Sequence, residues 1–547
     1  MAPLVGLTSW LILLSLTSNA STRQSATIVL SAHGPRPEAQ AACSALDVDF
    51  LRYLDYDKST REVEQYWVGS EQNPTCRAIT TFGKLKTLPC DARLPALCSQ
   101  SAPLSSLSNS NNGSQWQTTV QTGEAAITGY RDKLSFRFLG LKHAPYPSRF
   151  TYSTYQAPGG NVSALEYGPR CIQAGCNTPT CSEDCLYLNI WTPHLSSNPN
   201  SSKKSVMLFI HGGFTSGSGS DTVYDGGNMA SRGDVVVVTI NYRLSTLGCL
   251  AVGNTTARGT YWLSDQVAAL EWVQIHIEDF GGDKSRVTVV DQSAGSASVR
   301  ALLAAPPDAI NSTQAIFNEK DCTQPDEARR LACLRALDPT ELISGTITRY
   351  PVLDGEFLTT SELVLDGSGS LLDVAIMTGV MRNDGGPFTS FAKDGNASQV
   401  LINQGYDATT ILSSGLYPPG DTGNTTLDIF NLTQRVTTNA MYRCLTQSTA
   451  FAAAKNCVFP PTHRRATRQR RQRTPRRPQP AALQVPQRRD FLRLRHSQYL
   501  LDSWTAFGRT RDPNPQIGYM RARGYVNTSA VRERATPWFG WLVGLRL

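Results

Sequence analysis

The sequence predicts an α/β fold with a mostly parallel central sheet and helices on both faces. Residues 233–243 are a continuous, largely β-branched run, typical of a parallel strand buried on both faces. A helix with an apolar face is predicted next by the spacing of Leu263, Val267, Leu270, Val273 and Ile277. A second β-branched run follows at residues 287–290. Strand, helix and strand in alternation indicate parallel strands joined by helices.

A serine stands where that last strand changes into a helix. The β-branched run reaches Ser293, which is flanked by small residues and followed by a helix-forming stretch. Such a turn aims a serine hydroxyl outward and points the amides of the helix N-terminus at an attacked carbonyl. The pentapeptide at residues 291–295, Asp-Gln-Ser-Ala-Gly, is one residue away from Gly-x-Ser-x-Gly. The pattern therefore makes Ser293 the candidate nucleophile.

An earlier strand ends in glycines that suit the same chemistry. Residues 205–210 are a buried-type strand, and His211-Gly212-Gly213 follow directly. Glycines at this place let backbone amides approach a developing oxyanion.

Several motifs together resemble one family, the type-B carboxylesterases, to which cholinesterases and fungal lipases belong. The motifs lie at residues 182–193, 211–213, 241–243, 280–283, 291–295, 350–355, 377–386 and 499–515. The resemblance spans roughly residues 125–305, 320–445 and 497–525, and it is greatest to secreted fungal members. It implies an α/β-hydrolase fold and hydrolysis of carboxylic esters through a serine acyl-enzyme.

The resemblance also implies roles for individual residues. Ser293 would attack the ester, and the amides of Gly212, Gly213 and Ala294 would hold the oxyanion. Asp384 occupies the position of the triad acid, with Asp in place of the family's usual Glu. A carboxylate there would orient the base and stabilise its imidazolium. The alternative for Asp384 is a turn-stabilising role in Asn-Asp-Gly-Gly.

The catalytic base has no matching loop in this sequence. Only His463 and His496 follow Asp384, and neither lies in the Cys-His-Ser-Gly-like loop that supplies the family's base. Both are low-ranking candidates, with a structural role as the alternative. Residues 464–496 hold twelve Arg, one Asp and no Lys, without apolar periodicity. Three interpretations stay open for this non-family segment: out-of-frame translation, a solvated loop, or a polyanion-binding arm.

Other departures from the family pattern predict impaired activity. One glycine is missing before Phe214, Asp291 replaces the first glycine of the serine turn, and the segment from Ser293 to Cys322 is short. A lost oxyanion donor costs about 3 kcal/mol in the transition state. The predicted function is thus an ester hydrolase, impaired in this sequence. The alternative is an inactive, secreted, cholinesterase-like binding glycoprotein.

The thirteen cysteines indicate an oxidising compartment. Family resemblance implies the disulfides Cys171–Cys185 and Cys322–Cys333. Pairing of Cys176 with Cys181 and of Cys444 with Cys457 is a further expectation, and Cys249 is expected to be a free buried thiol.

The N-terminal quarter lies outside the esterase resemblance. We predict a signal peptide at residues 1–20 and a Cys-rich module at 21–125, ending in a Ser/Asn-rich linker at 101–115. The esterase-like domain is predicted at 126–547. The module loosely resembles the end of a C-type lectin-like fold, which would pair Cys76 with Cys90 and Cys43 with Cys98. An ordinary two-disulfide capping module is the alternative.

Charge and composition limit the partners. The net charge is +8, but residues 464–496 contribute +11, so the rest of the chain sums to 8 − 11 = −3. We therefore expect a small-molecule or lipid ester as substrate and no nucleic acid.

No stretch after the signal peptide reaches membrane-spanning length, and nothing implies a cofactor or metal. Nine Asn-x-Ser/Thr sites follow residue 20 and favour a secreted glycoprotein. The sequence gives no oligomeric state.

Overall fold

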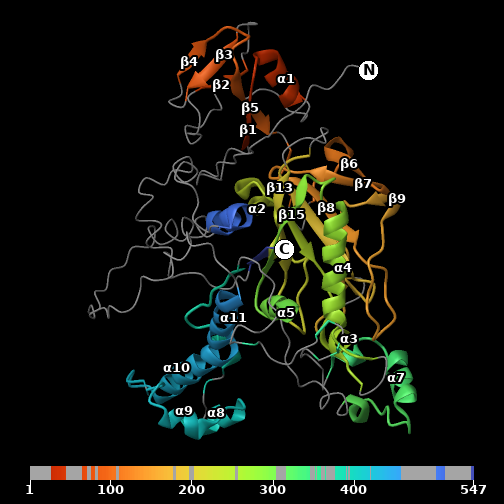
Figure 1. The fold of residues 1–547 in the computed structure, drawn as a ribbon, viewed down its shortest axis with the longest axis vertical. Helices are drawn as coiled ribbons and strands as arrows, with labels where there is room; N and C mark the ends of the chain where they lie inside the picture. The colour runs from red at the N-terminus through yellow and green to blue at the C-terminus, as the bar shows by residue number, and fades with distance from the viewer. Residues whose placement is uncertain are drawn as a thin grey trace. The chain divides into compact units, whose positions relative to one another are not determined.

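Figure 1 presents the computed structural model of the chain. It describes residues 26–44, 65–69, 76–80, 84–100, 102–105, 110–176, 180–195, 203–252, 257–303, 316–344, 352, 354–355, 357–358, 364, 376–389, 391, 395–418, 420–456, 501–511 and 544–546. The chain divides into two compact units. The first comprises Met1–Ser361, Val485–Ala535 and Gly544–Leu547, and the second comprises Glu362–Gln484 and Thr536–Val543.

The larger sheet of the first unit is mixed. Its order is β17-β15-β13-β14-β12-β8-β7-β6, with β9 pairing β7. The strands are β6 (Gln117–Thr122), β7 (Glu124–Arg131), β8 (Phe136–Lys142), β9 (Gly159–Ser163), β12 (Tyr187–Thr192), β13 (Lys204–Ile210), β14 (Val236–Ile240), β15 (Gly282–Asp291) and β17 (Gly544–Arg546). The predicted α/β-hydrolase architecture is present, but the sheet is not mostly parallel.

Parallel pairing is concentrated at the centre of this sheet. β13 pairs in parallel with both β14 and β15, whereas β12, β8, β7 and β6 form an antiparallel half. β17 also runs antiparallel to β15. The sequence prediction missed the antiparallel half because short turns, not helices, connect β6 to β7 and β7 to β8.

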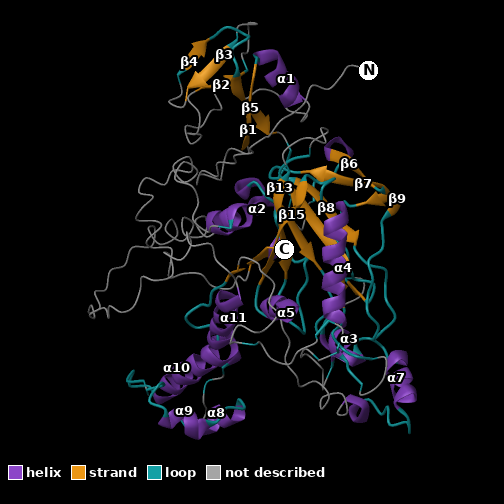
Figure 2. Ribbon diagram, viewed as in Figure 1, coloured by secondary structure: helices purple, strands orange, loops and turns teal. Residues whose placement is uncertain are grey.

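Helices lie on both sides of the parallel strands (Figure 2). They are α2 (Gly227–Gly233), α3 (Ser245–Cys249), α4 (Tyr261–His276), α5 (Ala294–Leu303) and a helix over residues 501–510. The connection from β13 to β14 and the connection from β14 to β15 cross the sheet in opposite directions. Right-handed crossovers therefore place α2 and α4 on opposite faces. The first unit also contains α7 (Glu327–Ala336) and the short 3₁₀ turns η2 (Ser114–Trp116), η3 (Thr222–Tyr224) and η4 (Glu341–Ile343).

Large aromatic side chains fill the space between α4 and the sheet. Trp272 and Phe280 are fully buried, and Phe280 meets Phe138 edge to face at a centroid distance of 4.8 Å. Asp265 of α4 is also fully buried and holds Arg243 through a bidentate ion pair. This pair fixes the chain just after β14 against α4.

The N-terminal module has its own five-stranded sheet in the order β1-β5-β2-β3-β4. Its elements are β1 (Ala26–Gly34), α1 (Arg36–Ser44), β2 (Gln65–Val68), β3 (Arg77–Thr80), β4 (Leu85–Thr87) and β5 (Leu94–Gln100). Disulfides join Cys43 to Cys98 and Cys76 to Cys90, the pairing that the lectin-like resemblance implies. Trp67 is buried between them and donates its indole N–H to the Gly34 carbonyl.

The larger sheet begins before residue 126, where the sequence analysis places the start of the esterase-like domain. β6 already pairs with β7 along its whole length. Its sequence, Gln-Thr-Thr-Val-Gln-Thr, buries only Val120 and Thr122, so it lacks the apolar content that marks a buried strand. The predicted signal peptide and the Arg-rich segment at 464–496 lie outside the described residues.

The second unit is mainly helical. It contains β16 (Ile376–Met377), the 3₁₀ turn η5 (Gly386–Phe388), α8 (Ala397–Asn403), α9 (Ala408–Ser413), α10 (Thr425–Thr438), the π-helical turn η6 (Asn439–Arg443) and α11 (Cys444–Asn456). Asn396, Asp407 and Asn424 cap α8, α9 and α10 through their side chains. Leu401, Ala408, Leu432 and Val436 form the apolar cluster between these helices.

Disulfides within the first unit also join Cys171 to Cys185, Cys176 to Cys181 and Cys322 to Cys333. Cys249 is a free buried thiol, and burial raises its pKa. The expectation for Cys444 is wrong, because its thiol is free and exposed; Cys457 lies outside the described residues. Among the residues that the structure describes, no helix is long and apolar enough to span a membrane.

Candidate active site

The candidate site forms where β13 and β15 end beside each other. These parallel strands are in register at their last residues, with Ile210 paired to Asp291. The residues that follow, His211-Gly212 on one strand and Gln292-Ser293 on the other, must therefore leave the sheet side by side. The carboxyl ends of neighbouring parallel strands are the usual place for ligands in open α/β sheets.

Ser293 occupies a strained turn between β15 and α5. Its φ is +57°, in the left-handed region that residues with a side chain rarely adopt. The amide of Gly295 donates to the Gln292 carbonyl at 2.8 Å, and the amide of Ser296 donates to the Ser293 carbonyl at 2.9 Å. The side chain of Ser293 is half-buried. Strain of this kind costs on the order of 1–3 kcal/mol and is concentrated at functional sites.

Glycines make this close approach possible. A Cβ placed on Gly212 would lie 2.9 Å from the Cβ of Ser293 and 2.8 Å from the Gln292 carbonyl oxygen. A Cβ on Gly295 would collide with the Ile210 carbonyl. Gly213 has a φ of +81° and starts the tight turn in which the Ser216 amide donates back to the Gly213 carbonyl. Larger residues at 212 or 295 would push the two strand ends apart.

Three backbone amides point to oxyanion chemistry. Within the described part of the chain, the N–H groups of Gly212, Gly213 and Ala294 have no hydrogen-bond acceptor. All three residues are only half-buried. They flank Ser293 on the β13 side and on the helix side, which is the arrangement needed to bind negative charge on a carbonyl attacked by that serine.

Asp291 is accommodated beneath the turn rather than beside the serine hydroxyl. It is fully buried at the last position of β15, and the hydroxyl of Ser296 donates to its Oδ1. A Cβ on Gly295 would lie 3.2 Å from the Asp291 Cβ, so the carboxylate fills the space between β15 and the first turn of α5. A negative charge at this end of a helix interacts favourably with the helix dipole.

Residues 211–219, which follow β13, are called the glycine loop below. His211 shapes this loop and is not available as a base. Its ring stacks on Tyr242 at a centroid distance of 4.3 Å, and its Nδ1–H donates to the Gly212 carbonyl at 2.8 Å. Burial lowers the pKa of His211 to about 4, so the ring is neutral at pH 7. The Tyr242 hydroxyl donates to the His211 carbonyl at 2.6 Å, and burial raises the pKa of Tyr242.

The other histidines with described side chains are held elsewhere in the first unit. His143 is buried and donates through Nε2 to the Asn241 carbonyl at 3.1 Å. His276 lies between the hydroxyls of Thr122 and Tyr155, each 2.7 Å away. His194 is buried at the end of β12, where burial lowers its pKa to about 4. The two sequence candidates for the base, His463 and His496, lie outside the described residues.

Asp384 belongs to the second unit. Its side chain is 7% exposed, and Oδ2 accepts a hydrogen bond from the Met381 amide at 2.6 Å. The next residue, Gly385, donates its amide to the Thr438 hydroxyl at 2.9 Å, which ties the turn to α10. The hydrogen bond from the Met381 amide corresponds to the turn-stabilising alternative.

Sequence reasoning missed the residues that support the glycine loop. Gln173, Tyr242 and Asn241 contact the loop or its flanks, and Ser296 supports Asp291. Asn241 and Tyr242 lie in a recognised motif, yet the motif alone does not reveal what their side chains touch. For Gln173 the only signal is a polar residue inside a cysteine-bounded loop. In the described residues no group of three His, Cys, Asp or Glu side chains has the arrangement of a metal site.

Comparison with known proteins supports the family resemblance. Residues 117–318 match the model of the carboxylesterase family. The resemblance predicted from the sequence is confirmed. In the structure of the carboxylesterase EST55 from Geobacillus stearothermophilus, 92% of the chain superimposes on 73% of this one, with a TM-score of 0.57 and 25% identity.

Curated carboxylesterase-family relatives include both enzymes and a neuroligin. The chain is 38% identical to acetylcholinesterase of Electrophorus electricus over 253 residues, covering 39% of each chain. It is 32% identical to bile salt-activated lipase of Mus musculus, covering 50% of this chain and 54% of the lipase. Neuroligin-2 of Mus musculus is 33% identical, over 37% of this chain and 30% of its own. The match to the acetylcholinesterase spans about two fifths of the relative's length.

Proposed function

We propose that this chain is a carboxylic ester hydrolase of the serine acyl-enzyme type, impaired in the printed sequence. The observation that carries the proposal is Ser293 at positive φ, at the end of a parallel strand, flanked by the unengaged amides of Gly212, Gly213 and Ala294. Packing alone does not explain a strained backbone at Ser293 beside three amides that have no acceptor among the described residues. The same arrangement serves attack on a carbonyl.

The proposed reaction has two stages. The Ser293 hydroxyl attacks the ester carbonyl, its proton passes to a base, and the oxyanion receives hydrogen bonds from the three amides. The carbon–oxygen bond to the alcohol then breaks, the base returns a proton to the leaving alkoxide, and an acyl-serine remains. Water attacks the acyl-serine in the same way and releases the carboxylic acid. Asp384 is proposed as the acid that orients the base.

Substrate, compartment and domain organisation complete the proposal. The relatives include a lipase and cholinesterases, which favours a small-molecule or lipid ester. The disulfides in the described residues favour a secreted, extracellular protein. Cleavage of residues 1–20, glycosylation, and a separate N-terminal module before the esterase-like domain belong to this proposal.

A second candidate function is partner binding without catalysis. It is favoured by two observations: the described histidines are engaged away from Ser293, and neuroligin-2 is among the similar proteins. Under this alternative the serine turn is a remnant of an active ancestor.

Covalent labelling separates the two candidates. A fluorophosphonate probe requires a single attack by the serine oxygen on phosphorus, with departure of fluoride, and no second hydrolytic step. We expect slow labelling of the wild type, none in Ser293→Ala, and wild-type labelling in Ser285→Ala, an exposed serine on the same strand. Labelling that persists in Ser293→Ala assigns the nucleophile elsewhere. A folded wild type that never reacts favours the binding alternative.

A further inference from the structure

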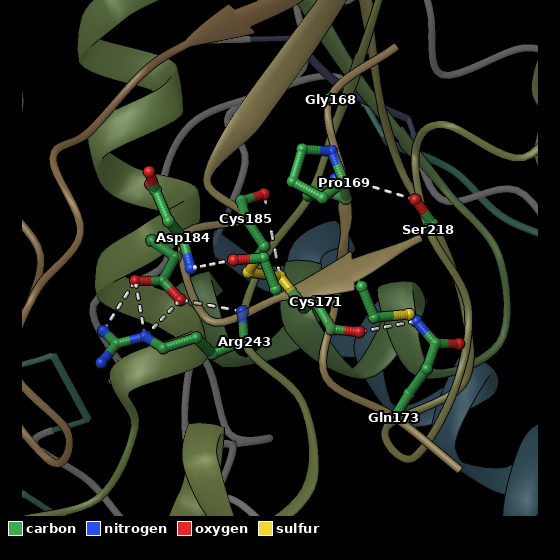
Figure 3. Close-up of a disulfide and its surroundings, with 12 residues drawn as sticks. Gly168, Pro169, Cys171, Gln173, Asp184, Cys185, Ser218 and Arg243 are labelled. Carbon is green, nitrogen blue, oxygen red and sulfur yellow. Dashed lines mark hydrogen bonds and ion pairs between the residues drawn. A yellow bond between two sulfur atoms is a disulfide. The ribbon is translucent and has the colours of Figure 1, made fainter. Parts of the chain in front are cut away.

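The loop that carries Gly212 and Gly213 is held by a neighbouring loop closed by a disulfide. Cys171 and Cys185 are bonded and almost fully buried, and Gln173 lies two residues into the loop between them. Figure 3 shows this disulfide with Gln173 and Ser218 beside it. Gln173 is itself only 5% exposed, so its side-chain amide must satisfy its hydrogen bonds inside the protein.

The side chain of Gln173 binds both the backbone carbonyl and the backbone amide of Gly217 in the glycine loop. Its Nε2 donates to the Gly217 carbonyl at 2.9 Å, and its Oε1 accepts from the Gly217 amide at 2.8 Å. The same Nε2 donates to the Cys171 carbonyl at 3.0 Å. Both polar atoms of the side chain are thus used, and they join the disulfide-bonded cysteine directly to Gly217.

Gly217 in turn packs on the residues next to the nucleophile. Its φ is +113°, and a Cβ there would lie 2.6 Å from the Gly212 carbonyl oxygen and 2.8 Å from the His211 Nδ1. The Gly212 backbone contacts the Ser293 turn, as described above. Gly217 packs directly against His211 and Gly212, with no free space between them. A shift of Gly217 toward these residues would therefore move the His211–Gly212 peptide as well.

A second clamp follows immediately along the loop. Asn241 accepts from the Ser218 hydroxyl at 2.9 Å and from the Gly219 amide at 2.8 Å, and it donates to the Pro169 carbonyl at 3.1 Å. Pro169 lies just before the disulfide-closed loop. Side chains from outside the loop thus hold residues 217–219, whereas Phe214 is held by the Ser245 amide, which donates to its carbonyl at 2.7 Å.

From this chain of contacts we infer that Gln173 is a positioning residue for the oxyanion loop, with the Cys171–Cys185 disulfide as its anchor. The inference rests on the proposed function, because an oxyanion is what the loop would bind. Gln173 touches neither Ser293 nor a substrate. It acts by holding Gly217, and through Gly217 the amides of Gly212 and Gly213, at the place where charge develops.

Hydrogen exchange of the full-length oxidised protein tests the inference without depending on catalysis. In Gln173→Met, which keeps the side-chain volume and loses the amide, we expect exchange in residues 211–219 to accelerate about 10-fold or more. The matched control is Gln274→Met, because Gln274 also donates to a backbone carbonyl, that of Lys284, at an exposed site. Exchange in 211–219 that stays within twofold of wild type in Gln173→Met overturns the inference.

Two further arms separate this inference from the proposed function. The rate of fluorophosphonate labelling of Ser293 should fall about 10-fold in Gln173→Met and stay unchanged in Gln274→Met. Faster exchange with an unchanged labelling rate overturns the positioning role. A wild type that is never labelled refutes the proposed function, and the exchange result then decides the inference alone.

The anchor is tested with paired cysteine variants. Cys171→Ala/Cys185→Ala should accelerate exchange in residues 211–219 as Gln173→Met does, whereas Cys322→Ala/Cys333→Ala should leave that loop unchanged. Equal exchange of the loop in both double variants removes the disulfide from the inference. If the first double variant does not fold, Gln173→Met still decides the role of Gln173.

Discussion

At the scale of single residues, the serine turn depends on a buried carboxylate. Asp291 has no exposed surface, and the Ser296 hydroxyl is one of its donors. The family pattern has glycine at position 291, so the sequence predicts crowding there. The structure places the carboxylate under α5, where the Ser296 hydroxyl donates to its Oδ1 and the nearby helix N-terminus favours a negative charge.

Removal of the Ser296 hydroxyl should therefore destabilise the protein. We expect Ser296→Ala to lower the free energy of unfolding by about 1–3 kcal/mol, because a buried carboxylate loses a donor. Urea denaturation followed by tryptophan fluorescence measures this. Ser285→Ala is the matched control: Ser285 also donates to an aspartate, Asp283, at 2.6 Å, but at an exposed position of β15. The control should change stability by no more than about 0.5 kcal/mol. Equal effects of the two variants would contradict the role given to Asp291.

The residues around the nucleophile were only partly predictable. Ser293, Gly212, Gly213 and Ala294 could be named because small residues at strand ends are visible in the sequence. Their supports could not, since Gln173 lies 44 residues before the Gly217 it holds and Tyr242 lies 31 residues after the His211 carbonyl it donates to. Hydrogen bonds between distant segments leave no periodic signal in the chain.

At the scale of elements, sequence patterns located the buried pieces best. The run at 233–243 contains β14, and the apolar spacing from Leu263 to Ile277 marks α4. Most side chains of α4 are buried, including the polar side chains of Asp265 and Gln266. The positions of polar residues in its sequence therefore do not predict which face of α4 is exposed. The sequence did not predict edge strands such as β6. The side chains on one face of such a strand are polar, and those on its other face are a mixture of polar and apolar.

The Cys322–Cys333 disulfide belongs to this scale, because it fixes α7 to the turn after residue 316. Cys322 is fully buried, and the loop closed by the bond has a sequence separation of 11 residues. Arg149 donates to the carbonyl of Leu337, the residue that ends α7, at 2.6 Å while pairing with Glu183. The disulfide and Arg149 therefore both hold the C-terminal half of α7.

Loss of this disulfide should weaken the protein by a predictable amount. We expect Cys322→Ala/Cys333→Ala to lower the free energy of unfolding by about 2–3 kcal/mol through loop-closure entropy. Non-reducing peptide mapping should recover the linked peptides from wild type. Cys444→Ala is the control, since Cys444 is a free exposed thiol, and it should be neutral. Recovery of Cys322 and Cys333 as free thiols in secreted protein would refute the pairing.

At the scale of the whole molecule, the segment that matches the family model contains only part of the candidate catalytic machinery. Residues 117–318 match the family model, and they contain the candidate nucleophile, the glycine loop and the strands β13 and β15 that bring the two together. The candidate acid Asp384 lies in a separate compact unit, and the candidates for the base, His463 and His496, lie at the two ends of the Arg-rich segment that departs from the family. A triad draws on residues far apart in the chain, so one disrupted segment suffices to disable it while the fold around the serine persists.

The sheet is also altered beyond β15. In the described residues, the strand that pairs with the outer edge of β15 is β17, which comes from the end of the chain and runs antiparallel. The shortness of the segment between Ser293 and Cys322 predicts that the next core strand of the family pattern is missing. A neighbouring antiparallel strand completes the hydrogen bonds of β15, but it does not bring a loop to the carboxyl edge where Ser293 lies.

These features together predict that the printed chain turns over esters very slowly. A serine hydroxyl requires a base within about 2.6–3.2 Å, and the described histidines are bound to Asn241, Thr122, Tyr155 and Gly212 or buried at the end of β12. Without a triad base, oxyanion binding alone supports a rate only about 10³–10⁴-fold above the uncatalysed reaction.

Hydrolysis of p-nitrophenyl butyrate by purified protein measures this directly. We expect a rate near that residual level, lowered further in Gly212→Ala, because a Cβ at 212 would push against Ser293.

His463→Ala and His496→Ala should each leave the rate unchanged, since neither lies in a loop resembling the one that supplies the family's base. A chain in which codons 455–500 are read in the frame that yields a Cys-His-Ser-Gly-like loop should gain activity by several orders of magnitude, because the parallel strands β13 and β15 already bring the glycine loop and its proposed oxyanion donors beside Ser293. Robust turnover by the printed chain that either histidine variant abolishes would instead place the base at that histidine and make the protein an active esterase as it stands.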